Sequence, residues 1–335
     1  MKSVVCFGEA LIDFQPLAGL DPGSPTTYQQ HAGGAPANVA VAVATLGGRS
    51  EFVGMLGNDT FGDFLLESLV TAGVGVGHVQ RTSAAPTALA FVTLDAHGER
   101  SFSFYRQPAA DLLFRECKLS PAVFGDAAVF HVCSNSLTEE GIAQATLACM
   151  RRARQAGVVV SFDVNLRPAL WPREANPAAR IWSALALADV VKLSREELDF
   201  LAAPLDGEAA VFEALWKHKA GLLVVTDGAR PMRWLAPGAH GSLEPFRVRA
   251  VDTTAAGDAF TAGLLYALAT RGIGRESLPA WVSDADRREL VLRFAAACGA
   301  LAVTRRGAFA AMPGRAEVEA LLHAQDQPAE EVATS

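Results

Sequence analysis

The sequence has few cysteines and no long apolar run. Its five cysteines, at positions 6, 117, 133, 149 and 298, are widely spaced, with neither a Cys-x-x-Cys pair nor a histidine at metal-site spacing. No stretch approaches the roughly 18 apolar residues of a membrane span, and the N-terminus enters a strand-like segment without the apolar core of a secretory signal. We therefore expect reduced thiols, no membrane partner and a cytoplasmic location.

Positive charge is also in the minority. The chain has 29 Lys and Arg against 36 Asp and Glu, a formal net charge of −7, which argues against a nucleic-acid partner. Half of its 335 residues are hydrophobic, which is enough for a large buried core.

Several nucleotide-binding signatures are missing as well. The chain contains no Gly-x-x-x-x-Gly-Lys-Ser/Thr loop, and the glycines at 73–77 do not form the dinucleotide fingerprint after a first strand. Neither His-Arg-Asp nor Asp-Phe-Gly occurs, which excludes a protein-kinase site. These absences disfavour P-loop NTPases, nicotinamide dehydrogenases and protein kinases.

What the chain does contain is a regular alternation of short apolar runs and helical stretches. This alternation is typical of an α/β fold with a mostly parallel sheet between helix layers. The predicted strands are Ser3–Phe7, Ser50–Met55, Ala127–His131, Val158–Asp163, Asp189–Leu193 and Gly221–Thr226. The predicted helices are Asn38–Leu46, Asp59–Ala72, Glu139–Ala156, Glu196–Leu201, Gly257–Thr270 and Arg287–Val303.

One segment departs from this alternation. From Thr87 to Tyr105 apolar residues recur with period two around a turn at 95–98, which indicates an antiparallel hairpin. We expect segments 14–32 and 87–106 to pair as a small β lid inserted into a single domain of residues 1–325. The polar, acidic residues 326–335 are expected to be a disordered tail.

The segment 251–260 is the most informative for chemistry. Small residues stand directly before an apolar helix, so the first backbone N–H groups of that helix are accessible and its dipole favours an anion. Asp258 lies in the first turn, where it could also be an ordinary helix-start residue. A single helix cap does not explain why Asp252, two threonines and several small residues gather here, so we favour a phosphate site.

Two earlier segments suggest a polyol site. Gly33 and Gly34 allow close approach of a ligand, and Asn38 offers both a donor and an acceptor to hydroxyl groups. Asp13 follows the first strand and could accept hydrogen bonds from two adjacent sugar hydroxyls. Each segment alone would also suit an inert helix start or a turn.

Taken together, these segments resemble the ribokinase-like (PfkB) family of carbohydrate kinases, and most of all its bacterial fructokinases. The resemblance covers residues 3–313 and depends on two ordered signatures, Gly33-Gly34 with Asn38 and the block 252–260. Supporting matches lie at 7–13, 104–106 with 110–111, 162–167 and 192–198. The resemblance implies a three-layer α/β/α ribokinase-like, Rossmann-like sandwich with a mostly parallel central sheet and a β-strand lid.

The resemblance also implies roles for individual residues. Asp258 would be the base that accepts the proton of the attacking hydroxyl, beside an anion hole formed by the N–H groups of Ala255, Ala256 and Gly257. Ala255 replaces the family's more usual glycine. Substrate contacts would come from Asp13, Gly33, Gly34, Asn38, Tyr105, Arg106, Asp163, Asn165 and Arg167.

The implied cofactors are ATP, Mg²⁺ and K⁺. Nucleotide contacts would come from Lys192, Ser194, Glu197, Thr226, Gly228, Ala296 and Gly299. Glu197 would act on Mg²⁺ through water, in an Asn-x-x-Glu element whose Asn is here Ser194. Asp252, Thr254 and Gly307 would hold the monovalent cation.

The resemblance favours phosphorylation of fructose to fructose 6-phosphate by a homodimer joined through its lids. A 2-keto-3-deoxygluconate kinase of the same family is the first alternative, because Tyr105, Arg106, Asn165 and Arg167 could hold a carboxylate. Asp111 counts against an anionic sugar. A non-catalytic sugar sensor and a nucleoside kinase are weaker alternatives.

Overall fold

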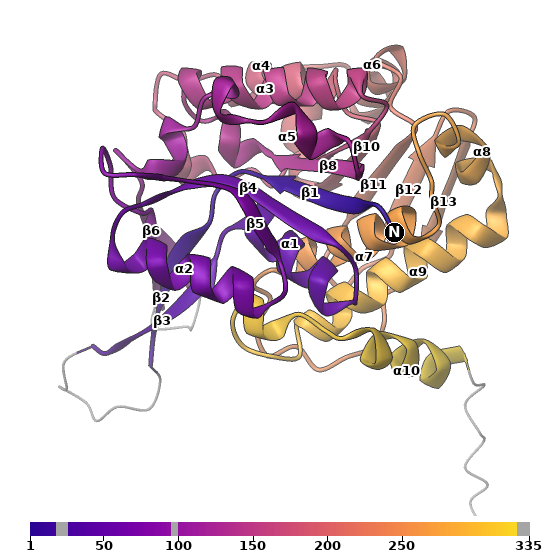
Figure 1. Ribbon diagram of the computed structural model, residues 1–335. Helices are drawn as coiled ribbons and strands as arrows, with labels where there is room; N and C mark the ends of the chain where they lie inside the picture. The colour runs from indigo at the N-terminus through magenta and orange to yellow at the C-terminus, as the bar shows by residue number, and fades with distance from the viewer. Residues whose placement is uncertain (18–25, 95–99, 327–335) are drawn as a thin grey trace, which may run out of the picture.

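A large twisted sheet forms the centre of the protein (Figure 1). The computed structural model describes residues 1–17, 26–94 and 100–326. Within them, the central sheet has nine strands, in the order β13 (Ala239–Leu243), β12 (Met232–Ala236), β11 (Leu222–Thr226), β10 (Val190–Ser194), β9 (Val159–Asp163), β8 (Ala127–Cys133), β1 (Ser3–Phe7), β4 (Ser50–Gly57) and β5 (Gly75–Thr82). Strands β11 to β5 run parallel, and β12 and β13 form an antiparallel edge.

Helices cover both faces of this sheet, as a parallel sheet requires (Figure 1). One face carries α3 (Glu140–Gln155), α4 (Pro177–Leu185), α5 (Arg195–Ala202) and α6 (Glu208–Lys217). The other carries α1 (Ala35–Thr45), α2 (Thr60–Thr71), α7 (Ala256–Thr270), α8 (Leu278–Ser283), α9 (Ala285–Ala302) and, outside α9, α10 (Arg315–Asp326). The predicted three-layer α/β arrangement is confirmed.

Helix α7 lies inside its layer, between α1 and α9. It is apolar around its circumference, with residues 258–269 buried, which is the pattern of a helix that contacts protein on every side. Gly263 permits the close packing, because a Cβ there would lie 2.8 Å from Sγ of Cys298. The N-terminus of α7 is thereby fixed at the carboxyl edge of the sheet.

A second sheet of four strands stands beside the first (Figure 1). It has the order β3 (Tyr28–Gly33), β2 (Leu11–Pro16), β6 (Leu89–Leu94), β7 (Arg100–Tyr105), and we call it the lid sheet. The hairpin expected at 87–105 is present as β6 and β7, and β2 pairs with β6 in parallel. The predicted turn at 95–98 and residues 327–335 of the predicted tail lie outside the described residues, whereas Asp326, expected in that tail, is the last residue of α10.

All six predicted strands exist, with ends within two residues of those expected. Helix α1 begins three residues earlier than predicted, because Pro36 fits its first turn. None of the helices in the described residues is both long and apolar enough to span a bilayer.

Candidate active site

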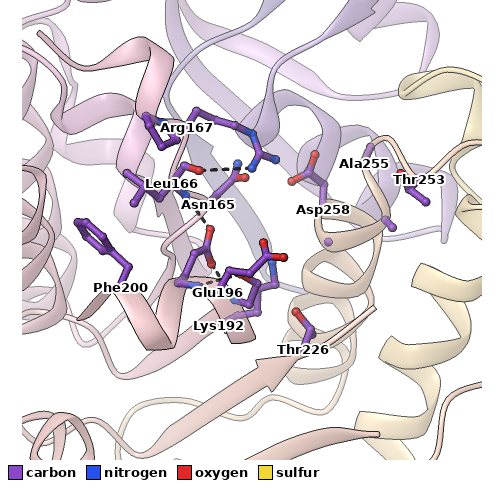
Figure 2. Close-up of a pocket in the computed structure, with 15 residues that line it drawn as sticks. Asn165, Leu166, Arg167, Lys192, Glu196, Phe200, Thr226, Thr253, Ala255 and Asp258 are labelled. Atoms are coloured by element: carbon purple, nitrogen blue, oxygen red, sulfur yellow. Dashed lines mark hydrogen bonds between the residues drawn. The ribbon is translucent and has the colours of Figure 1, made fainter. Parts of the chain in front are cut away.

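The N-terminus of α7 opens into a cavity of about 470 Å³ (Figure 2). Ala255 immediately precedes the helix with left-handed backbone angles, φ 59° and ψ 12°. No side chain caps the helix within the described residues, so its first-turn N–H groups remain available to a ligand, apart from that of Ala256, which makes a long bond of 3.4 Å to the Thr253 carbonyl oxygen. This is the environment that stabilises a phosphate group, and residues 255–257 all line it.

Asp258 lies in the first turn of α7 at the wall of this cavity. Burial raises the pKa of its carboxyl to about 6, against a hydrogen bond from Nδ2 of Asn38 at 2.7 Å that lowers it. The neighbouring charges oppose one another, since Asp163 raises this pKa and Lys192 and Arg167 lower it. A carboxylate with a pKa of about 6 can accept a proton at neutral pH.

The segments predicted to form a polyol site meet at the same place. Gly33 ends β3 opposite Leu11 in β2, and a Cβ on Gly33 would overlap the carboxylate of Asp13, two residues further along β2. Gly34 has φ 105°, and its Cβ would lie 2.6 Å from the carbonyl oxygen of Glu9. Burial, together with Asp258 and Asp252, raises the pKa of Asp13 to about 7. Two carboxyl groups and Asn38 therefore converge beside the start of α7.

Lys192 supplies a buried cation to the cavity (Figure 2). Its Nζ donates to both carboxylate oxygens of Asp163, at 3.0 and 3.1 Å. Thr261 Oγ1 donates to the same carboxylate at 3.3 Å. Burial lowers the pKa of Lys192, but Asp163 and Glu197 raise it more, so the net shift keeps the amine protonated. Both carboxylate oxygens of Asp163 thus accept hydrogen bonds from side chains of the protein itself.

Glu197 also lines the first cavity, and its carboxylate is held by backbone N–H groups. Its two carboxylate oxygens accept hydrogen bonds from the N–H groups of Ser194 and Leu166, each at 2.7 Å. With Ser194 it also forms the capping box of α5, in which Ser194 Oγ accepts from the Glu197 N–H. Ser194 therefore caps a helix in the position of the family's asparagine.

A second cavity of about 430 Å³ adjoins the first and shares Thr226, Thr253, Ala256 and Gly257 with it. Its walls are mainly apolar, and Gly228, Ala296 and Gly299 line it as expected. A Cβ on Gly299 would lie 3.1 Å from the carbonyl oxygen of Ala256, so a larger residue would narrow this space. The pair of cavities suits a nucleotide, with the base in the apolar part and the phosphates at α7.

Asp252 is buried beside the α7 turn. Its carboxylate accepts from the N–H of Thr254 at 2.9 Å and from the N–H of Gly307 at 3.1 Å. Gly307 has φ 91°, which favours glycine at this position. The structure thus brings together the three residues expected around a monovalent cation.

Two predicted substrate residues lie elsewhere. The Arg106 guanidinium is buried against Asp111, to which its Nε donates at 2.9 Å and its Nη2 at 2.5 Å. Tyr105 on β7 is 65% exposed, with its ring against Phe91. Both line a separate cavity next to Trp171. In contrast, Arg167 extends toward Asp258, and Asn165 lies beneath it with φ 35° (Figure 2).

Sequence reasoning missed Thr261 and the buried acid Glu9. Thr261 stands three residues after Asp258, on the same side of an otherwise apolar helix, and that spacing could have revealed it. Glu9 accepts from Asn135 Nδ2 at 2.9 Å beneath the lid sheet. Nothing in its local sequence distinguishes it from a turn residue.

The model of the pfkB family of carbohydrate kinases matches residues 1–315. The chain belongs to this family. It is 43% identical to fructokinase-1 of Oryza sativa over 320 residues, which are 95% of this chain and 97% of the relative. A fructokinase of Xylella fastidiosa, solved with bound ATP, is 54% identical and superposes with a TM-score of 0.93, covering 97% of this kinase and 99% of that chain.

A further fructokinase, a double mutant from Vibrio cholerae, was solved with fructose, ADP and a potassium ion. It is 34% identical and superposes with a TM-score of 0.83, covering 96% of this chain and 98% of that one.

Proposed function

We propose that this chain is an ATP-dependent fructokinase, which converts fructose and ATP to fructose 6-phosphate and ADP. The observation that carries the proposal is the place of Asp258, a buried carboxylate in the first turn of α7, at the junction of a polyol-type site and two joined cavities. The fructokinase relatives, similar over nearly the whole chain, support fructose as the sugar.

The reaction follows from this arrangement. Asp258 accepts the proton of the sugar's 6-hydroxyl while that oxygen forms a bond to the γ-phosphorus of ATP. The bond from the γ-phosphorus to the bridging oxygen breaks, and the electron pair leaves with ADP. The N–H groups of residues 255–257 stabilise the charge on the transferring phosphoryl group, which is where phosphoryl transfer needs it.

The polar residues fix the fructose around the base. Asp13, Gly33, Gly34 and Asn38 line the sugar, and Asn38 still has a buried carbonyl oxygen without a partner among the described residues. A sugar hydroxyl would satisfy that oxygen. Arg167 stands at the outer end of the site beside Asp258.

Two cations complete the proposal. Mg²⁺, when bound, would neutralise phosphate oxygens, and the first cavity offers it an acidic wall of Glu196 and Glu197, of which Glu197 would act through water. We place K⁺ at Asp252, Thr254 and Gly307, because the converging backbone turns and the buried carboxylate suit a weakly hydrated cation. The Lys192 amine faces the same phosphate site, and Thr226, Gly228, Ala296 and Gly299 surround the nucleotide base.

We further propose that the lid sheet covers the sugar and joins two copies of the chain. Its strands β2 and β3 carry Asp13 and Gly33, so the sheet is already part of the sugar site. One of its faces holds a row of aromatic rings from Phe14, Phe91 and Tyr105, the last 65% exposed. Covering such a face is favourable, and a homodimer of cytoplasmic chains would do so.

A sugar panel tests the function. ADP release and the phosphorylated product should be measured with fructose, 2-keto-3-deoxygluconate, ribose and a purine nucleoside, with and without K⁺. We expect fructose to give the highest kcat/KM. The Arg106 guanidinium is occupied by Asp111, which disfavours the carboxylate sugar. A clear preference for 2-keto-3-deoxygluconate, or no ADP release with any sugar, would refute the proposal.

A further inference from the structure

Asp59 connects the first turn of α2 to the start of the lid strand β6. Its Oδ1 accepts from the N–H of Gly62 at 2.7 Å, which is the ordinary bond of a helix N-cap. The same carboxylate also binds Thr87, 28 positions away: Oδ2 accepts from the Thr87 N–H at 2.7 Å, and Oδ1 from the Thr87 hydroxyl at 2.8 Å. A helix cap needs only the bond from Gly62, so the two bonds from Thr87 have another consequence for the fold.

Thr87 is buried at the place where β4 ends and the lid sheet begins. Its hydroxyl oxygen accepts from the N–H of Gly57, the last residue of β4, at 3.1 Å. Two glycines leave the space for this cluster. A Cβ on Gly57 would overlap the Asp59 carboxylate, and a Cβ on Gly62 would overlap the Gly57 carbonyl oxygen. The end of β4, the start of α2 and the start of β6 are thus joined at one carboxylate.

The anchor at Thr87 reaches strand β2 after one further residue. The carbonyl oxygen of Ala88, next to Thr87, accepts from the N–H of Ile12 in β2 at 3.1 Å. From there β6 pairs with β2 in parallel, and Asp13 lies within the paired stretch. The position of Thr87 therefore sets the position of the strand that carries Asp13, a proposed sugar ligand.

The first turn of α2 also contacts β2 directly. The ring of Phe61, two residues after Asp59, packs edge-on against the ring of Phe14 in β2, with the ring centroids 5.8 Å apart. Helix α2 lies beside the lid sheet in Figure 1, in agreement with its contacts to β2 and β3. Ile12 and Phe14 are the two sequence neighbours of Asp13, so the start of α2 supports the backbone on both sides of this residue.

We propose that Asp59 is a positioning residue for the sugar site: its carboxylate anchors Thr87 at the start of β6 and thereby fixes the β2 strand that carries Asp13. The inference deepens the proposed function and rests on it insofar as Asp13 binds the sugar. Asp59 lines neither of the two cavities at α7, so its effect on the reaction passes through β2.

Asp59→Asn separates the anchor from the helix cap. Asparagine caps a helix as well as aspartate does, but its side chain has one acceptor oxygen, so the bond from the Thr87 N–H is lost. Hydrogen exchange of unliganded protein, read by mass spectrometry at single residues, should become about tenfold faster at the Thr87 amide. The Ile12 amide, bonded to Ala88, should also exchange faster. Unchanged exchange at either amide would overturn the proposal, because the anchor would then be absent or would end before β2.

Asp63→Asn is the matched control for lost charge. Asp63 lies in the same first turn of α2, its side chain is 71% exposed, and it pairs with Arg81. The variant removes one carboxylate charge and leaves the bonds between Asp59 and Thr87 in place. Both amides should therefore exchange as in the wild type. Equally fast exchange in Asp63→Asn would assign the effect to charge and overturn the proposal.

The kinetics distinguish positioning from a purely structural role. A misplaced Asp13 weakens sugar binding in the ground state and the transition state alike, so KM for fructose should rise about three- to tenfold in Asp59→Asn, with kcat within about twofold. Calorimetry on nucleotide-free protein should show a matching rise in the Kd of fructose. A loss of folded enzyme would instead lower kcat and leave KM for fructose unchanged, and that result would overturn the proposal.

Thr87 supplies an independent pair of variants. Thr87→Val keeps the shape of the side chain but removes the hydroxyl that donates to Asp59, whereas Thr87→Ser retains it. KM for fructose should rise in Thr87→Val and stay within about twofold of the wild type in Thr87→Ser. Combining Asp59→Asn with Thr87→Val should raise KM by less than the product of the single effects, since both break the same contact. Multiplicative effects would contradict a shared anchor.

The two kinds of measurement separate this inference from the proposed function. The kinetic and calorimetric measurements use whichever sugar in the panel is most active. If no sugar supports ADP release, the proposed function fails, and exchange at the Thr87 and Ile12 amides still decides whether Asp59 anchors β2.

Discussion

Asn38 in α1 donates a hydrogen bond of 2.7 Å from Nδ2 to Oδ2 of Asp258 in α7, across 220 positions of sequence. The bond fixes the orientation of both side chains, because an amide nitrogen can only donate and an ionised carboxylate can only accept. The Asn38 carbonyl oxygen is consequently left for a ligand donor. One contact between two packed helices thus positions both the proposed base, Asp258, and Asn38, the residue proposed to bind the sugar.

Asp258→Asn should lower kcat by about 10²–10⁴, because a positioned general base contributes a factor of that size. Fructose binding should change little, since an asparagine oxygen can still accept from Asn38. A coupled assay for ADP measures turnover, and calorimetry measures fructose binding. Equal losses of turnover and binding would show that Asp258 is a sugar ligand and not the base.

The stability of Asp258→Asn provides the control for this variant. The pKa of Asp258 in the folded protein lies above its ordinary value of 3.8, at about 6, so the folded state binds more protons than the unfolded state between these values. Its ionisation therefore costs stability as the pH rises through that window. At pH 8 we expect the free energy of unfolding of Asp258→Asn to be about 1–3 kcal/mol higher than that of the wild type. If Asp258→Asn were instead less stable than the wild type, misfolding would explain its lost turnover.

The pH dependence of the wild-type enzyme follows from the same carboxyl group. Burial raises its pKa to about 6, and only the ionised form can accept the hydroxyl proton. We expect kcat/KM for fructose to rise with pH through about 6 and then to level off. Initial rates in buffers of constant ionic strength would measure this limb. A profile flat from pH 5 to pH 8 would contradict a base with this pKa.

Ala255→Gly should stabilise the protein by about 1 kcal/mol, because glycine adopts left-handed angles without the clash of a Cβ. The N–H group that faces the cavity is retained, so kcat should stay within about twofold. Ala256→Gly is the matched neighbour, since this residue is helical and glycine should destabilise there by about 0.5–1 kcal/mol. Urea unfolding compares the two. Destabilisation by both substitutions would show that Ala255 carries no strain.

The central sheet was predictable because its strands are continuous apolar runs and its helices have a clear period. The edge strands were missed because β5 and β13 are half-buried, with polar residues among their apolar ones. A sheet edge contacts neighbours on fewer sides, so the hydrophobic pattern there is weak. Helices α4 and α6 were overlooked although both have a conventional apolar face.

The site was predictable where one local segment supplies the chemistry, as at the start of α7. It was less predictable where contacts between distant residues decide a role. Nothing in the segment 104–111 shows that Arg106 pairs with Asp111 in the interior, and nothing near Glu197 shows that its carboxylate bonds to Leu166. Such pairings depend on how the loops fold back on the sheet, which the spacing of residues along the chain does not reveal.

The pair of Arg106 and Asp111 yields the last prediction. Both side chains are 4% exposed, and the guanidinium also donates to the Asn135 carbonyl at 2.9 Å. Asp111→Ala leaves a buried cation without its partner, although Glu9 remains nearby. We expect a loss of about 3–5 kcal/mol in the free energy of unfolding.

Arg49→Ala is the control for this prediction, because it removes an ion pair with Asp126 in which both side chains are more than half exposed. Its cost should be below about 1 kcal/mol, since water and salt screen such a pair. Chemical denaturation at pH 7 measures both variants. Similar costs for the two variants would mean that Arg106 finds a new partner when Asp111 is removed, and that its burial does not depend on that one acid.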